Sequence, residues 1–163
     1  MFPLEYIYIF LWLVSHNKIM TRDNLKRRHL NKPEDCAFCS QLENVHHLLF
    51  DFVVASNTWE LLSGFYGFQI GKDYESVARF WVSNKKNSAL NSITSDALWC
   101  IWKSRNAIVF NNSLWTNNKQ VWSLLSRTAK NWSILSQGPA LEKILDFCQF
   151  LSKKIKAPLP ICG

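Results

Sequence analysis

The sequence predicts a mainly α-helical protein, a small helical domain with a short irregular segment rich in Cys and His near its N-terminus. Apolar residues recur at the three- and four-residue spacing of amphipathic helices over most of the chain. With 163 residues the chain can bury one core, and 8 Trp and 11 Phe indicate that aromatic side chains dominate it. The low Gly and Pro counts, five each, exclude collagen-like and low-complexity chains.

The individual helices follow from this spacing and from residues that begin or end helices. Thr21 is a good N-cap. Asp23 lies in the first turn, where its negative charge suits the positive N-terminal end of the helix dipole. The strongest helix runs over residues 92–110, with inward positions at steps of four and three. Gln137-Gly138-Pro139 predicts the end of the helix before it. The predicted helices cover residues 21–29, 53–63, 74–84, 92–110, 118–135 and 141–155.

The N-terminal run of apolar and aromatic residues has a structure that its spacing leaves open. Because residues 4–14 are apolar on both sides, periodicity does not separate helix from strand. The run is shorter than the about 20 residues that cross a bilayer, so we expect no membrane span. Glu5 precedes the run and no small-residue cleavage motif follows, which argues against a signal peptide. We expect a core element or an exposed docking surface.

The cysteines indicate a reducing environment. Their number is odd and only two lie close together, which does not suit a disulfide framework. We therefore expect an intracellular protein, with nucleus and cytoplasm both open. The five are Cys36, Cys39, Cys100, Cys148 and Cys162.

Most of the positive charge lies in one stretch. Residues 17–32 hold six Lys and Arg and one acid, a local charge of +5 within a chain total of +7. Basic residues on a short helix suit phosphate groups, so we expect RNA or DNA as the partner. The alternative is a solvated helix face above an inward Leu25 and Leu30. The candidate phosphate contacts are Lys18, Arg22, Lys26, Arg27 and Arg28.

The Cys and His residues of the irregular segment have the spacing of a metal site. Cys36 and Cys39 form a C-x2-C pair, and His47 follows after seven further residues. Two thiolates on one turn and a returning imidazole supply three of the four ligands that zinc takes in structural sites. The alternative is that both cysteines are simply small packed or free residues.

The fourth ligand of such a site is in question. A cysteine separated from His47 by four residues would complete the set, but Phe52 stands there. Asp51, His46 or a remote cysteine are the substitutes. His46 and His47 would point apart in an extended segment, so both are not expected on one ion. An open position with bound water is typical of catalytic zinc, but no general base has convincing spacing.

Three ordered blocks of this sequence resemble a known family. The first is Phe10–Arg28, with FLWL followed by HNKIMTRDNLKRR. The second is the C-x2-C pair with Glu43, then HLLF and Trp59. The third is Ala97–Phe110, similar to a W-x-I-W-x-x-R-N-x-x-V-F helix. Together they resemble the zinc-binding region that follows the polymerase domain in plant non-LTR retrotransposon reverse transcriptases.

The resemblance implies zinc as the cofactor, with Cys36, Cys39 and His47 on the ligand positions. Phe52 stands where the family has cysteine, which puts zinc in doubt and suggests an orphaned or degenerate copy. No polymerase or ribonuclease-H-like domain is recognisable here.

We therefore expect a non-enzymatic, nucleic-acid-associated accessory domain without a small-molecule substrate. Residues 1–65 form the zinc-binding-like region and residues 66–163 a helical extension packed with it. The alternatives are a structural remnant without activity and a docking module for a missing polymerase domain.

Overall fold

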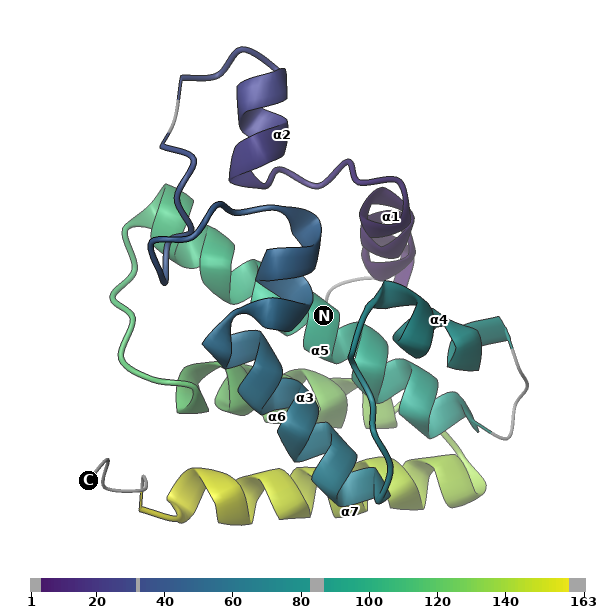
Figure 1. The fold of residues 1–163 in the computed structure, drawn as a ribbon. Coiled ribbons are helices and arrows are strands. Elements are labelled where there is room, and N and C mark those ends of the chain that lie inside the picture. The colour runs from purple at the N-terminus through teal and green to yellow at the C-terminus, as the bar shows by residue number, and fades with distance from the viewer. Residues whose placement is uncertain (1–3, 32, 83–86, 159–163) are drawn as a thin grey trace.

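The computed structural model describes residues 4–31, 33–82 and 87–158, and these residues form a helical protein, as predicted (Figure 1). They contain no strand, and a single antiparallel bridge joins Asp35 and Leu42. None of their helices is both long and apolar enough to cross a membrane. The elements in order are α1 (Leu4–Ser15), α2 (Arg22–Arg27), the π-helical turn η1 (His47–Asp51), α3 (Val53–Tyr66), α4 (Tyr74–Val82), α5 (Ser88–Asn111), α6 (Lys119–Ser133) and α7 (Gly138–Lys156).

The N-terminal run is a helix, which settles what its spacing left open. One side of α1 is buried through Ile7, Phe10, Leu11 and Val14, the three- and four-residue spacing of a helix stripe. The opposite side carries exposed apolar residues, with Tyr8 66% exposed. The run is apolar on both sides because only one of them faces the core.

The predicted helices are present, and most of their ends differ from the structure by one to four residues. Gly138 and Pro139 begin α7 rather than only ending the helix before it. Proline suits the first helical turn because its missing N–H would have no partner there. The helix predicted over 74–84 is described as far as Val82, and its last two residues lie outside the described residues.

The long helix α5 holds the molecule together. It packs against α1, α3, α4, α6, α7 and η1. Figure 1 shows it passing through the middle, with α7 along the bottom of the view and α2 at the top. One hydrophobic core extends from Ile7 in α1 to Leu151 in α7. The predicted ranges 1–65 and 66–163 both contribute to this core, and their boundary stays a prediction.

Trp59 fixes the turn that carries His47. Its indole N–H donates to the carbonyl of Leu49, 2.7 Å away, and its ring stacks on Phe50. Gly71 packs against the ring so closely that a Cβ would lie 2.1 Å from a ring carbon, and its φ is +81°. Only glycine combines that conformation with that approach.

Candidate metal centre

The C-x2-C pair lies in a turn whose ends are tied together. The Cys36 N–H donates to the carbonyl of Gln41 at 2.8 Å, and the Glu43 N–H donates to that of Glu34 at 3.0 Å. These bonds flank the Asp35–Leu42 bridge and close the turn between them. Both thiols therefore lie on one short loop with a fixed start and end.

His47 comes from the first residue of η1, where the backbone makes an unusually wide turn. The His47 N–H donates to Oδ1 of Asn44 at 2.8 Å, and the Phe52 N–H donates to the His47 carbonyl at 3.0 Å. Single wide turns of this kind are frequent at functional sites. The side chain of His46 is exposed instead, with Nε2 lying 3.2 Å from Oδ1 of Asp51. The helical turn, rather than an extended strand, separates the two imidazoles.

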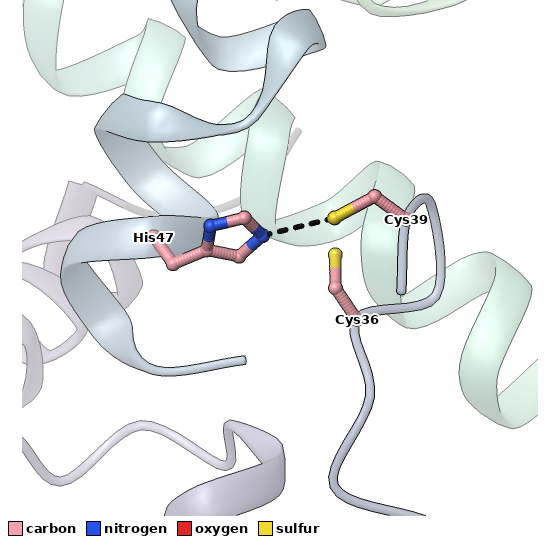
Figure 2. Close-up of side chains that lie close together, drawn as sticks. All are labelled: Cys36, Cys39 and His47. Atoms are coloured by element: carbon pink, nitrogen blue, oxygen red, sulfur yellow. Dashed lines mark hydrogen bonds between the residues drawn. The ribbon is translucent and has the colours of Figure 1, made fainter. Parts of the chain in front are cut away.

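The structure brings Cys36, Cys39 and His47 together, as Figure 2 shows. One ligand atom from each lies within 4.8 Å of the other two, and Cys39 Sγ is 3.3 Å from His47 Nε2. Tetrahedral zinc with sulfur and nitrogen ligands separates such atoms by about 3.6 Å. Three side chains therefore fit a zinc ion.

The fourth ligand position is apolar. Phe52 is only 3% exposed, and its ring stacks on Phe38, 4.7 Å away, and lies 6.2 Å from the His47 ring. Trp115, from the loop before α6, meets Phe38 edge-on. Asp51 is not in the group of three and faces His46, so its role as a ligand stays a prediction.

The buried Cys36 thiol holds its proton strongly. Burial raises the pKa of Cys36 to about 11, and the charge of Cys39 acts in the same direction. A metal ion reverses this preference because it binds the thiolate. The cysteines within the described residues form no disulfide, and a thiol must be reduced in order to bind a metal ion. They are Cys36, Cys39, Cys100 and Cys148.

Glu43 connects this loop to α5 through a buried ion pair, which the sequence did not predict, and to α2 through hydrogen bonds. Arg105 of α5 is fully buried, and its Nε and Nη2 donate to the two oxygens of the Glu43 carboxylate at 3.2 and 2.5 Å. Glu43 Oε1 also accepts the backbone N–H of Arg22, and the Glu43 carbonyl accepts that of Asp23. The sequence held one signal for this ion pair: Arg105 falls at an inward-facing position of the helix predicted over 92–110. A buried charge needs a partner of opposite charge.

Only some of the basic side chains that were predicted to contact phosphate form ion pairs with acidic residues. Lys26 forms an ion pair with Glu34, and Arg27 lies 3.7 Å from Asp23. Among the described residues no carboxylate pairs with the other three, Lys18, Arg22 and Arg28.

Lys18 and Arg28 lie together at the corner between α1 and α2. Arg28 Nη2 donates to the Lys18 carbonyl at 3.3 Å, and the Lys18 ammonium lies 5.2 Å from the centre of the Trp12 ring. Leu25 is buried, but Leu30 is 50% exposed, so the alternative with both leucines inward is only half right.

The segment that holds these residues matches a known protein family. Residues 4–59 match the family model described as zinc-binding in reverse transcriptase. The resemblance to a reverse transcriptase zinc-binding region is thereby confirmed for this segment, which contains every predicted metal and phosphate contact. The Ala97–Phe110 block lies outside the match, and plant origin and degeneracy stay predictions. No curated protein and no solved structure matches the chain.

Proposed function

We propose that the chain acts as a non-enzymatic accessory region of a retrotransposon reverse transcriptase, in which a zinc loop positions basic residues for nucleic acid. The connection through Glu43 carries the proposal. The loop that holds the two thiols ends in Glu43, whose carboxylate and carbonyl accept the first backbone N–H groups of α2. Ordering the loop therefore also orders the basic helix.

Zinc, when bound, would order the loop by neutralising two thiolates. Cys36, Cys39 and His47 would hold it, and the aromatic rings of Phe38 and Phe52 would shield one side. A site with three protein ligands binds more weakly than a complete one, because each ligand contributes a share of the about 10–16 kcal/mol of structural zinc sites.

Zinc titration of the unaltered chain and of Phe52→Cys tests this part. We expect measurable binding to the unaltered chain and at least about 100-fold tighter binding to Phe52→Cys. Phe50→Cys is the matched control, because it adds a thiol two residues away at a side chain stacked on Trp59. Zinc binding by neither the unaltered chain nor Phe52→Cys would remove the metal from the proposal.

The salt dependence of nucleic-acid binding tests the basic residues. Lys18→Ala/Arg28→Ala and Lys26→Ala/Arg27→Ala remove equal charge, but only the second pair already has acidic partners. We expect the first double variant to flatten the slope of log affinity against log salt by more than the second does, by up to about 1.5 for a single strand. Equal slopes in the unaltered chain and in both variants would remove these residues from the proposal.

A second candidate function rests on α1. Its outer side exposes Tyr6, Tyr8, Ile9 and Trp12, each more than half exposed. An apolar patch of this kind on a small protein is typical of a docking surface, here for a polymerase domain. We expect Tyr8→Lys/Ile9→Lys to reduce self-association of the isolated chain in sedimentation. A chain that is monomeric without these changes would argue against this candidate.

A further inference from the structure

A basic groove follows the outer side of α6, far along the chain from the matched segment. Two open hollows, of about 620 and 350 Å³, adjoin there and share Ser123 and Arg127 in their walls. We call them together the α6 groove. Its walls come from α5, from the loop before α6, from α6 itself and from α7.

The charged residues that line the α6 groove all have the same sign. They are Lys103, Lys119, Arg127, Lys130 and Lys156, and neither hollow is lined by an aspartate or a glutamate. Arg127, Lys130 and Lys156 are exposed, and no ion pair within the described parts of the chain involves them. Lys26 and Arg27 of the predicted basic stretch, in contrast, are paired with acids.

The rest of the lining suits an anionic oxygen ligand. Hydroxyl and amide side chains such as Ser104, Ser123 and Asn131 lie between the cations. Side chains of these types supply many of the phosphate and sugar contacts in nucleic-acid complexes.

The α6 groove also reaches the C-x2-C turn. Trp115 lines its larger hollow and meets Phe38 of the C-x2-C turn edge-on, with ring centres 5.0 Å apart.

We propose that the α6 groove binds the sugar–phosphate backbone of a nucleic-acid strand. The inference rests on the proposed nucleic-acid function and adds a second contact surface to it. The helix rises by about 16 Å between Lys119 and Lys130. About five nucleotides of a stacked strand cover the same length. The groove is concave and receives cations from three helices, which suits a strand better than a flat membrane surface.

The test compares two triple variants that lose the same charge. Arg127→Gln/Lys130→Gln/Lys156→Gln changes the groove. Lys72→Gln/Lys143→Gln/Lys154→Gln is the matched control, because these lysines are exposed and line neither hollow. Binding of a fluorescent oligouridine of about 20 nucleotides is measured by anisotropy between about 50 and about 200 mM salt. Circular dichroism establishes that each variant is folded.

We expect the groove variant to bind at least about tenfold more weakly at the lowest salt and to lose about 2 from the salt slope. The control should retain its slope to within about 0.5. Equal losses in the two triple variants would overturn the groove, since net charge alone would explain them.

The two proposals fail separately. A groove variant with an unchanged slope, beside a flattened slope in Lys18→Ala/Arg28→Ala, overturns the groove and leaves the proposed function in place. The reverse pattern keeps the groove and removes the corner between α1 and α2. Vesicles rich in phosphatidylserine that bind the unaltered chain more tightly than the oligouridine does would overturn a nucleic-acid strand as the ligand.

Lysine labelling of the unaltered chain provides a measurement that needs no variant. An amine-reactive reagent is applied with and without the oligouridine, and the modified lysines are located by mass spectrometry. We expect protection of Lys130 and Lys156, and unchanged labelling of Lys72 and Lys143. Protection of Lys18 without protection of Lys130 and Lys156 would overturn the groove.

Discussion

Two buried carboxyl groups, on opposite sides of α5, have different partners. Glu43, at the end of the C-x2-C turn (residues 34–43), faces the guanidinium of Arg105. Asp96 belongs to α5 itself and faces α6, where it accepts hydrogen bonds from the hydroxyl of Thr128 at 2.6 Å and the thiol of Cys100 at 3.7 Å. Arg105 and Asp96 are nine residues apart, which at 3.6 residues per turn places them on opposite faces of the helix.

The partners decide how each carboxyl behaves. Glu43 forms a two-point ion pair in a site where both side chains are fully buried. Asp96 is 2% exposed, and burial raises its pKa to about 7 although Thr128 and Cys100 act in the opposite direction. Dipoles alone do not replace the water that a carboxylate loses on burial.

The difference separates two kinds of junction in one fold. The Glu43–Arg105 junction holds the C-x2-C turn on α5 through charge. The Asp96–Thr128 junction holds α6 on α5 through a carboxyl that takes up a proton near neutral pH. The first should depend on both partners being present, and the second on pH.

The largest effect should follow from breaking the ion pair. Arg105→Met leaves Glu43 buried without its cation, so we expect a loss of about 3–5 kcal/mol in the free energy of unfolding, measured with denaturant at pH 7. Arg127→Met is the matched control at an exposed site, with an expected change below about 0.5 kcal/mol.

The double variant Glu43→Gln/Arg105→Met should recover part of that loss, because the neutral amide no longer needs a cation. A double variant that is less stable than Arg105→Met by the full cost of Glu43→Gln would show that the two side chains act independently. That additivity would contradict the ion pair as the element that holds the loop.

Asp96 should give a smaller effect that depends on pH. The pKa of about 7 in the folded state exceeds the value of about 3.9 expected when unfolded, so the unfolded state loses the proton first. Stability contributed by the protonated carboxyl is present in full below pH 4 and is lost as pH rises towards 7. We expect Asp96→Asn to be more stable than the unaltered chain by about 2–4 kcal/mol at pH 8, and close to it at pH 4.

Denaturant unfolding of both chains from pH 4 to pH 8 measures this difference. Asp146, a carboxyl on the exposed side of α7, supplies the control: Asp146→Asn should leave the pH dependence unchanged. A stability difference between Asp96→Asn and the unaltered chain that is constant over this range would contradict a raised pKa for Asp96.

The helices could be read from the sequence because their signals are local. The step pattern of α5 and the N-cap position of Thr21 depend only on neighbouring residues. Where the structure depends on distant residues, the sequence did not decide between helix and strand. The run 4–14 is apolar on two sides, and only the packing of Ile7 and Phe10 against the rest of the chain decides that it is helical.

The candidate metal site was partly predictable for a similar reason. The spacing of Cys36, Cys39 and His47 suits three ligands on a short loop, and the structure brings those atoms together. The ion pair between Glu43 and Arg105 was not predicted, because the two residues are 62 positions apart. The α6 groove was missed because its cations come from three separate helices and form no charged run in the sequence.

The smallest effect concerns the hydroxyl that faces Asp96. Thr128→Val keeps the side-chain shape and removes the donor, so we expect a loss of about 1 kcal/mol at pH 5 and about 2 kcal/mol at pH 8. The cost grows with pH because the hydroxyl stabilises the ionised carboxylate, and without it the pKa of Asp96 rises further. In the Asp96→Asn background the pH dependence of the Thr128→Val cost should vanish. Equal costs at both pH values in the unaltered background would mean that the hydroxyl bonds only to the Leu124 carbonyl, 2.9 Å away, and that Asp96 depends on burial and Cys100 alone.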